Sequence, residues 1–228
     1  MELKNADGLT EKEFLEQYRP GDYEHPSVTV DMLIFAVDSK DEGVDLLLIR
    51  RKNHPCIGKW AIPGGFVEMN ESLEEAAARE LKEETGLEDL CLEQLFAWGD
   101  VKRDPRTRVI SVSYMSVVPK DQLKPQAGDD AEEAVWFQVK KKKLSDSENG
   151  ATYALTIEND ERSIFIGYRI TETYEQKGLM WHRDVQADLL PAIDAPEDEA
   201  LAFDHVYILN QALDRLEEME REYRESLI

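Results

Sequence analysis

The chain has 228 residues, enough for one generous domain or for one domain with an elaboration. Its formal net charge of −22 argues against unspecific binding to nucleic acid or to an anionic membrane surface, because phosphate groups would be repelled. We therefore expect no nucleic-acid partner and no membrane partner. The 2 cysteines lack metal-ligand spacing, and the chain has neither an apolar leader nor a long apolar run, which together predict a cytoplasmic protein.

The first part of the chain predicts a short helix and then a pair of strands. Residues 9–19 have the pattern of an amphipathic helix, with Thr10 as its N-cap. Residues 27–37 and 44–51 are apolar and β-branched, so the polar turn between them predicts a β-hairpin. A short strand around residues 60–62 then leads into a glycine turn.

Residues 64–87 read GGFVEMNESLEEAAARELKEETGL and predict that glycine turn followed by a helix. Ser72 and Glu75 have the spacing of a capping box, so the helix should begin there. Gly86 is suited to a left-handed C-terminal cap, so the helix should end at residue 85. Its buried stripe should consist of residues four apart, namely Leu73, Ala77 and Leu81.

The second half of this helix is acidic where it should be apolar. Glu80 and Glu84 fall almost on the line of the buried stripe, and Glu83 lies beside them. At roughly 6 Å and an effective dielectric constant of about 20, each pair of carboxylates repels by about 3 kcal/mol. A hard divalent cation, Mg²⁺ or Mn²⁺, would remove this repulsion. The alternative is a solvated acidic face, against which the isolated Glu71 and the Arg79-Glu80 pair argue.

The remainder of the chain alternates strands with polar segments. Residues 89–101, 108–118 and 134–139 predict strands, and residues 119–133 predict a polar loop. Lys140–Lys143 is interpreted as a solvated strand end, with an anion site as the alternative. Strands that alternate with one central helix, followed by a late helix, favour an α/β fold.

The C-terminal third predicts an added hairpin and a long helix. Residues 151–158 and 162–171 alternate like strands around a turn, whereas residues 172–196 show no clear pattern. Helical periodicity returns from about residue 197, where acidic residues suit a helix N-terminus. His205 falls in this helix and is interpreted as structural. The apolar side should contain Leu201, Ile208, Ala212, Leu213, Leu216, Met219 and Tyr223.

The acidic stretch resembles the Nudix box of the Nudix hydrolases at all of its defining positions. The match reads Gly65, five residues, Glu71, seven residues, Arg79-Glu80-Leu81, one residue, Glu83-Glu84, one residue, Gly86-Leu87. The resemblance implies a Nudix α/β/α sandwich with a mixed sheet, here extended by the extra β-hairpin and the long C-terminal helix. It also implies Mg²⁺-dependent hydrolysis of a nucleoside diphosphate linked to another group, with Mn²⁺ as a substitute.

The resemblance also implies roles for single residues. Glu80 and Glu84 would bind the metal directly, and Glu83 would either bind metal or orient the attacking water. Arg79 would hold the glutamates in place by ion pairing.

Two further positions of the box have implied roles around the metal. Glu71 would belong to the outer metal shell. The glycine turn would contribute a backbone carbonyl near Gly64 or Gly65.

Basic residues gather on either side of the box. Arg51 ends a predicted strand, and Arg103 and Arg106 belong to a basic loop over residues 102–108. Guanidinium groups match phosphate oxygens, so these arginines are candidate substrate ligands; polar strand ends are the alternative.

Aromatic and acidic residues near the box have two interpretations each. Trp60 either packs beneath the glycine turn or lines a base pocket, and the same ambiguity applies to Phe66. Glu133, or its neighbour Glu132, is a candidate general base in an acidic loop, and a solvated loop is the alternative.

The stretches IPGGFVE (62–68) and RDPRTRVISVSY (103–114) look like the ADP-ribose pyrophosphatase branch of the family. This implies cleavage of ADP-ribose to AMP and ribose 5-phosphate, although Pro105 stands a residue or two beyond the proline that marks the branch. One alternative is a house-cleaning nucleoside triphosphate pyrophosphatase. The other is an ADP-ribose-sensing transcription regulator, against which the 13 acidic and 3 basic residues of 184–228 argue.

These patterns divide the chain into four parts. We expect a helical lead-in over 1–24, a Nudix core over 25–144, a β-hairpin insertion over 145–196 and a C-terminal helix over 197–228 that packs on the core. The hairpin and the long helix offer an interface for a homodimer. The expected partner besides a second copy is a small nucleotide substrate.

Overall fold

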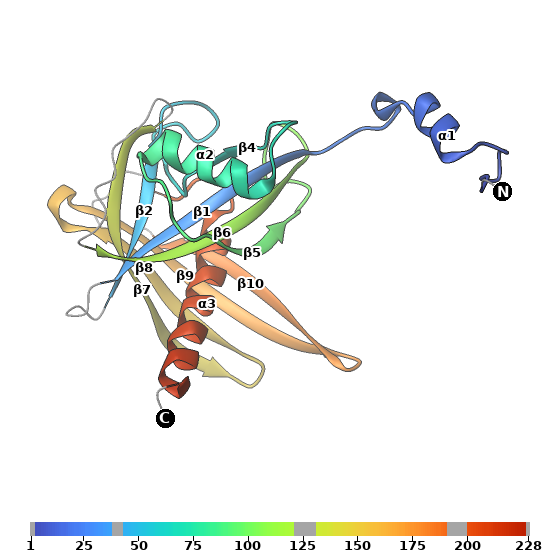
Figure 1. Cartoon of the computed structure of the whole chain (residues 1–228). Coiled ribbons are helices and arrows are strands. Elements are labelled where there is room, and N and C mark those ends of the chain that lie inside the picture. The colour runs from blue at the N-terminus through green and yellow to red at the C-terminus, as the bar shows by residue number, and fades with distance from the viewer. Residues whose placement is uncertain (1–2, 38–42, 121–130, 191–199, 227–228) are drawn as a thin grey trace.

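The computed structural model of the chain describes residues 3–37, 43–120, 131–190 and 200–226. Within these residues the centre of the fold is a mixed sheet of 10 strands in the order β10-β9-β8-β7-β2-β1-β6-β5, with β3 paired to β2 and β4 paired to β1 (Figure 1). The strands are β1 (Ser27–Val37), β2 (Val44–Arg51), β3 (Trp60–Ala61), β4 (Gly64–Phe66), β5 (Glu93–Trp98), β6 (Val109–Pro119), β7 (Ala131–Ser147), β8 (Gly150–Asn159), β9 (Ile164–Lys177) and β10 (Met180–Leu190). The α-helices are α1 (Glu11–Gln17), α2 (Leu73–Thr85) and α3 (His205–Ser226).

Strand β1 organises the sheet around the glycine turn. It pairs with the parallel strand β6 over its whole length. Its other edge changes partner, because residues 29–31 pair with β4 whereas residues 35–37 pair with β2. The predicted hairpin of β1 and β2 is therefore confirmed, and the divergence of β2 makes room for the short strands that carry the glycine turn.

The two faces of the sheet are covered by different helices, as Figure 1 shows. Alternate side chains of a strand point to opposite faces, and β1 is apolar on both of them. Val30, Met32 and Ile34 pack with buried residues of α2. Leu33 and Phe35 pack on the other face, in the cluster that contains the buried side of α3. The predicted α/β/α sandwich is confirmed.

The region after β7 extends the same sheet. β7 runs on to residue 147 and pairs first with β2 and then with β8. The expected extra hairpin exists as β8 and β9. Residues 172–196, where the sequence showed no clear pattern, contain the end of β9 and the whole of β10. The extension is thus a meander of the main sheet that crosses the boundary expected at residue 144.

Lys141 corrects the interpretation of the lysine run as a solvated strand end. Its side chain is only 5% exposed, because alternate residues of β7 face α3. Its Nζ lies 3.2 Å from Glu172 and 2.6 Å from Asp214, and Arg183 binds the same two carboxylates. Burial opposes ionisation of Glu172, but these cations and Asn210 lower its pKa to about 2. The network joins the extension to α3.

Helix α3 begins at His205, not near residues 197–199 as expected. Residues 197–199 lie outside the described part of the chain, and residues 200–204 are extended or turned instead of helical. The reason is that this segment bonds to the sheet: the backbone N–H of Leu201 donates to Tyr168 Oη, and that of Ala202 donates to the carbonyl of Trp60.

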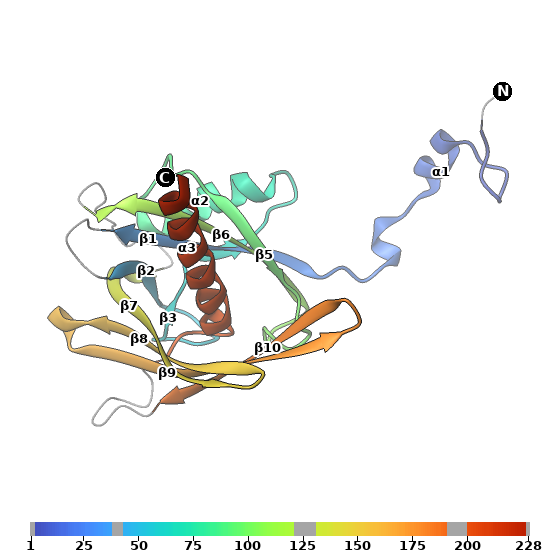
Figure 2. The same cartoon turned by 90° about the horizontal axis from the view of Figure 1, so that it is seen from below.

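The N-terminal helix α1 lies apart from the sheet in both views (Figures 1 and 2). Thr10 and Glu13 form its capping box, which confirms the predicted cap. It has no buried residue. None of the described helices is both long enough and apolar enough to cross a membrane.

Candidate active site

A cavity of about 510 Å³ lies between α2, the glycine turn and the start of α3. Its wall has two halves that we name by their charge. The acidic half consists of α2 side chains, and the basic half carries three arginines from other elements. The acidic half contains Arg79, Glu80, Glu83 and Glu84; the basic half contains Arg51, Arg103 and Arg106.

Helix α2 forms as its sequence predicts. Ser72 accepts a hydrogen bond from the backbone N–H of Glu75, and the Glu75 carboxylate accepts one from the N–H of Ser72. Gly86 ends the helix in the left-handed region, at φ 71°. Ala76, Ala77 and Leu81 are buried, whereas Leu73 is only partly buried. The capped helix fixes the angles at which the glutamates enter the cavity.

Arg79 is the cation that holds the acidic half together. Its guanidinium donates two hydrogen bonds to Glu71, at 3.0 and 2.7 Å, one to Glu80 at 2.9 Å and one to Glu83 at 3.1 Å. It also donates to the carbonyl oxygen of Phe66, at 3.0 Å. The hydrogen bonds from Arg79 lower the pKa of Glu71 to about 2, and those to Glu71 raise the pKa of Arg79 itself.

The glycine turn lies close to the glutamates and to the backbone of β1. The N–H of Gly64 donates to Glu84 Oε2 at 2.8 Å, and Glu84 is only 7% exposed. A Cβ atom on Gly65 would lie 2.2 Å from the Glu80 carboxylate, and one on Gly64 would lie 2.2 Å from the carbonyl oxygen of Val30. Burial raises the pKa of Glu80, and the hydrogen bond from Arg79 opposes this rise.

The donor set of the acidic half fits a hard divalent cation. Glu80, Glu83 and Glu84 all line the cavity, and they offer only oxygen atoms. No group of three or more His, Cys, Asp or Glu side chains in the described part of the chain is already gathered in a metal-binding arrangement. The physical reason is that Glu80 and Glu83 are turned toward Arg79 and Glu84 toward Gly64. Glu83 is exposed and can turn most easily.

Two of the three arginines in the basic half have their own aspartate. Arg103 donates to both carboxylate oxygens of Asp204, at 2.8 Å each, and its side chain is only 6% exposed. Arg106 binds Asp104 through Nε at 3.0 Å and through Nη2 at 2.7 Å. Burial alone would raise the pKa of Asp104, but hydrogen bonds from Arg106 lower it.

Arg51 differs from both. Its Nε donates to the carbonyl oxygen of Pro55 at 2.9 Å, and no carboxylate in the described ranges lies within ion-pair distance of it. Its guanidinium lies 5.0 Å from the ring centre of Phe203. Arg106 lies near the same ring, at 5.9 Å, and near the ring of Phe66, at 5.1 Å. Burial and the charge of Arg106 lower the pKa of Arg51.

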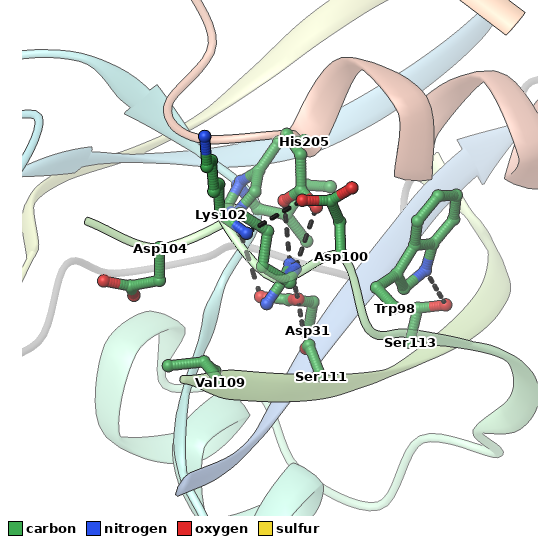
Figure 3. A network of polar contacts seen from close by, with 12 residues as sticks. Asp31, Trp98, Asp100, Lys102, Asp104, Val109, Ser111, Ser113 and His205 are labelled. Carbon is green, nitrogen blue, oxygen red and sulfur yellow. Dashed lines mark hydrogen bonds and ion pairs between the residues drawn. The ribbon is translucent and has the colours of Figure 1, made fainter. Parts of the chain in front are cut away.

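A buried polar network supports the basic half from behind (Figure 3). Ser111 Oγ donates to Asp31 Oδ2 at 2.5 Å, and Asp31 Oδ1 lies 3.8 Å from His205 Nε2. The backbone N–H of Ile62 donates to His205 Nδ1 at 2.9 Å, so this nitrogen carries no proton. Burial lowers the pKa of His205 to about 3 and raises the pKa of Asp31. His205 is therefore neutral at pH 7.

Two predicted site residues lie elsewhere. Trp60 is 3% exposed and packs edge-on against Phe137, with ring centres 4.7 Å apart, so it does not line the cavity. Of its two interpretations, the base pocket does not fit, because the side chain belongs to the core cluster that contains the buried side of α3. Glu133 is also absent from the cavity wall; it lies 3.5 Å from Arg50 and forms an ion pair with Arg162. The other residues predicted for the box and the basic loop come together at one cavity, except Glu71, which reaches it through Arg79.

Sequence reasoning missed the residues that pair with or support the arginines. Asp31 carried a usable signal, because a single aspartate in the middle of an apolar strand needs a buried partner. Asp104 lies inside the basic loop, for which the prediction considered only the arginines. Phe203 and Asp204 carried no signal, since nothing in the sequence indicates that the start of α3 reaches the cavity.

Comparisons with known proteins agree with this geometry. The family model described as "NUDIX domain" matches residues 26–155. The chain is 45% identical over 131 residues to an ADP-ribose pyrophosphatase of Methanocaldococcus jannaschii, which covers 58% of this chain and 72% of that protein. It is 43% identical over 111 residues to an ADPR responsive transcriptional repressor of Acinetobacter baylyi, covering 48% of this chain but only 44% of the repressor. The crystal structure of a MutT/nudix family protein from Enterococcus faecalis superposes with a TM-score of 0.67 and 32% identity, covering 92% of this chain and 70% of that one. The chain therefore belongs to the NUDIX family and is a Nudix pyrophosphohydrolase.

Proposed function

We propose that this protein hydrolyses the pyrophosphate bond of ADP-ribose to give AMP and ribose 5-phosphate, with Mg²⁺ as cofactor and Mn²⁺ as a substitute. The observation that carries the proposal is the division of one cavity into a carboxylate wall and an arginine wall. A magnesium diphosphate needs both, since the cation requires oxygen ligands and the phosphate oxygens require donors. The names of two relatives, a pyrophosphatase and a repressor, both refer to ADP-ribose and support this substrate.

The acidic half is the proposed cation site. Glu80 and Glu84 would hold Mg²⁺ directly, together with a backbone carbonyl near Gly64, and Glu71 would act from the outer shell through Arg79. Mg²⁺, when bound, neutralises charge on the diphosphate and acidifies a water molecule. Arg79 offsets part of the negative charge of Glu80 and Glu83, because its guanidinium donates a hydrogen bond to each of them.

Glu83 is the best-placed residue for proton transfer. It lines the cavity, its side chain is 58% exposed, and a single hydrogen bond to Arg79 restrains it. We propose that it orients the attacking water or accepts its proton, the role for which Glu133 was the other candidate.

The basic half is the proposed diphosphate site. Arg51 is the arginine with the most freedom to bind phosphate, because Arg103 and Arg106 already carry aspartate partners. Phe66 is partly exposed at the cavity wall and offers an apolar surface to the nucleoside.

A second candidate function is an ADP-ribose-responsive regulator, which the 43% identity to the repressor favours. Such a protein would bind ADP-ribose in the same cavity and bind DNA elsewhere. The 13 acidic and 3 basic residues of 184–228 have the wrong sign for phosphate contacts in this region.

One experiment separates these functions. The protein is incubated with Mg²⁺ and, in parallel, ADP-ribose, NADH, a diadenosine polyphosphate, a nucleoside triphosphate and a nucleotide sugar, and the products are identified by chromatography. AMP and ribose 5-phosphate from ADP-ribose support the proposal, whereas faster turnover of the triphosphate would replace it. Saturable binding of genomic DNA fragments at low salt, without hydrolysis, would favour the regulator.

We also propose that the protein is cytoplasmic and that it forms a homodimer. Cys56 and Cys91 are both free, which suits a reducing cytoplasm. The homodimer is supported by the edge position of β10, whose side chains are largely exposed. Light scattering of the purified protein would give the oligomeric state.

A further inference from the structure

The segment before α3 adds residues to the cavity that lie outside the matched NUDIX region. Residues 200–205, which we call the strap, pass along the sheet next to β3. Two hydrogen bonds fix the strap to the sheet: Leu201 N–H to Tyr168 Oη at 2.9 Å and Ala202 N–H to the Trp60 carbonyl at 2.8 Å. A third, from His205 N–H to the Ala202 carbonyl at 3.2 Å, closes a turn within the strap. Phe203 and His205 both line the cavity.

Phe203 has a backbone conformation that bulky residues seldom adopt. Its φ is 50°, in the left-handed region, which costs free energy for any residue with a Cβ atom. The bonds on either side of it maintain this conformation, and the ring is packed against Ile49, Ala61 and Ala202. Strain of this kind is retained where the surrounding structure determines it, and it gathers at functional sites.

The ring of Phe203 faces the one cavity arginine that lacks a carboxylate partner among the described residues. The Arg51 guanidinium lies 5.0 Å from the ring centre, within the range of a cation–π contact. Among the described residues its side chain donates one hydrogen bond, from Nε to the carbonyl oxygen of Pro55. An arginine side chain has many rotamers, so one hydrogen bond leaves the two Nη atoms poorly oriented, and a flat ring beneath the guanidinium supplies the second restraint.

We propose that Phe203 is a positioning residue: its ring holds the Arg51 guanidinium so that the free Nη atoms face the cavity and bind a diphosphate oxygen. The inference rests on the proposed function, since it takes a diphosphate as the ligand. The ring restrains the guanidinium of Arg51, as an aspartate restrains that of Arg103 and that of Arg106. It does so without neutralising Arg51, which therefore keeps its full charge for the substrate.

The test is a double-mutant cycle on the affinity for methylenediphosphonate, a non-hydrolysable diphosphate, in the presence of Mg²⁺. Calorimetric titration compares wild type with Phe203→Leu, Arg51→Ala and the double variant. Phe203→Leu should weaken binding about fivefold, the fold-change expected for one cation–π contact. Arg51→Ala should weaken it about 10- to 100-fold. The double variant should bind like Arg51→Ala, to within about twofold, because the ring acts chiefly through Arg51. Arg106 lies farther from the ring centre, at 5.9 Å, and Asp104 already holds it.

Further variants separate positioning from a structural role. Phe203→Tyr keeps the ring and should bind like wild type. Phe203→Met is a second substitution without a ring, so a folding defect of one variant does not decide the result. Phe165→Leu, on the exposed side of β9, is the matched control and should bind like wild type. Thermal unfolding of each protein is measured alongside.

The inference is overturned if both ring-free variants bind methylenediphosphonate like wild type. It is also overturned if the loss of affinity in the double variant equals the product of the losses in the two single variants. ADP-ribose hydrolysis is measured on the same proteins to keep the two proposals apart. Hydrolysis by wild type together with unchanged affinity in the ring-free variants leaves the proposed function standing and removes the inference. Coupling of Phe203 to Arg51 in a protein that does not hydrolyse ADP-ribose removes the proposed substrate and leaves the inference standing.

Discussion

The acidic and the basic halves of the cavity differ in how the chain supplies them. The acidic half comes from one continuous stretch, the glycine turn and α2, in which a single arginine is shared among several carboxylates. The basic half comes from the end of β2, the loop before β6 and the strap, and two of its arginines each donate hydrogen bonds to an aspartate. A wall of carboxylates can thus be built from one local stretch, whereas the wall of arginines here requires long-range contacts.

The largest expected effect is on the acidic half. Glu84→Gln keeps an oxygen that can accept the hydrogen bond from Gly64 but removes the charge that would bind the cation. We expect hydrolysis to fall by about 1000-fold or more, about 4 kcal/mol in transition-state stabilisation, with the fold intact. Steady-state kinetics in Mg²⁺ and circular dichroism measure the two properties. Glu88→Gln, an exposed residue beyond α2, is the control and should retain wild-type activity.

The next largest effect is on the free energy of unfolding, when an arginine of the basic half is removed. Arg103→Ala leaves the buried Asp31 and the partly buried Asp204 without their cation, so we expect the free energy of unfolding to fall by about 3 kcal/mol. Arg51→Ala leaves no carboxylate unpaired and should cost less than about 1 kcal/mol. Urea unfolding of the two variants compares them. Equal losses of unfolding free energy in the two variants would contradict the difference between Arg103, which has carboxylate partners, and Arg51, which has none among the described residues.

Arg79→Lys tests the sharing of one cation. Lysine keeps the charge but cannot form the two parallel hydrogen bonds to Glu71 while also reaching Glu80 and Glu83. We expect activity at limiting Mg²⁺ to fall about 10- to 100-fold, as is usual for the loss of an outer-shell partner. A Mg²⁺ titration of the hydrolysis rate should show that most of the loss lies in the concentration needed for half-activation. Unchanged half-activation would contradict the role given to Arg79.

The smallest effect is the pH dependence of stability due to His205. Its pKa in the folded protein is about 3, below the unfolded value of 6.5, so the unfolded state binds the extra proton between these limits. Stability is therefore complete above pH 6.5 and falls as the pH drops, by at most about 1.4 kcal/mol per pH unit for this group. Asp31, Asp204, Arg103 and Arg51 surround the ring and contribute to this value.

The free energy of unfolding is measured in urea at pH 6.5 and at pH 5. Both pH values lie above the range in which most carboxylates titrate. In His205→Asn the amide oxygen can take the place of Nδ1 as acceptor for the Ile62 N–H, and this variant should lose less stability between the two pH values. An identical loss in wild type and variant would assign the pH dependence to other groups.

Local chemistry explains which elements could be predicted from the sequence. The capping box at Ser72, the left-handed Gly86 and the apolar stripe lie within 15 residues, so the limits of α2 followed from the sequence alone. The pairing of β1 with β2 was equally local. Strand β10 was missed because its residues alternate weakly and face solvent on one side of the sheet edge.

The parts that could not be predicted depend on contacts between distant segments. Arg103 was expected at the site and lines the cavity, but its partner Asp204 lies 101 residues away in the sequence. Phe203 reaches Arg51 only because the strap is bonded to β3 and β9. Sequence periodicity describes one element at a time, and it cannot indicate which elements meet.

The separate tasks of the two halves are tested most directly by Mn²⁺ binding without substrate. Loss of the electron paramagnetic resonance signal of free Mn²⁺ gives the affinity for wild type, Glu84→Gln and Arg51→Ala. The predicted result is that Glu84→Gln loses the tight site while Arg51→Ala keeps the wild-type affinity. Tight binding that survives in Glu84→Gln, or that is lost equally in Arg51→Ala, would contradict the assignment of the cation to the acidic half.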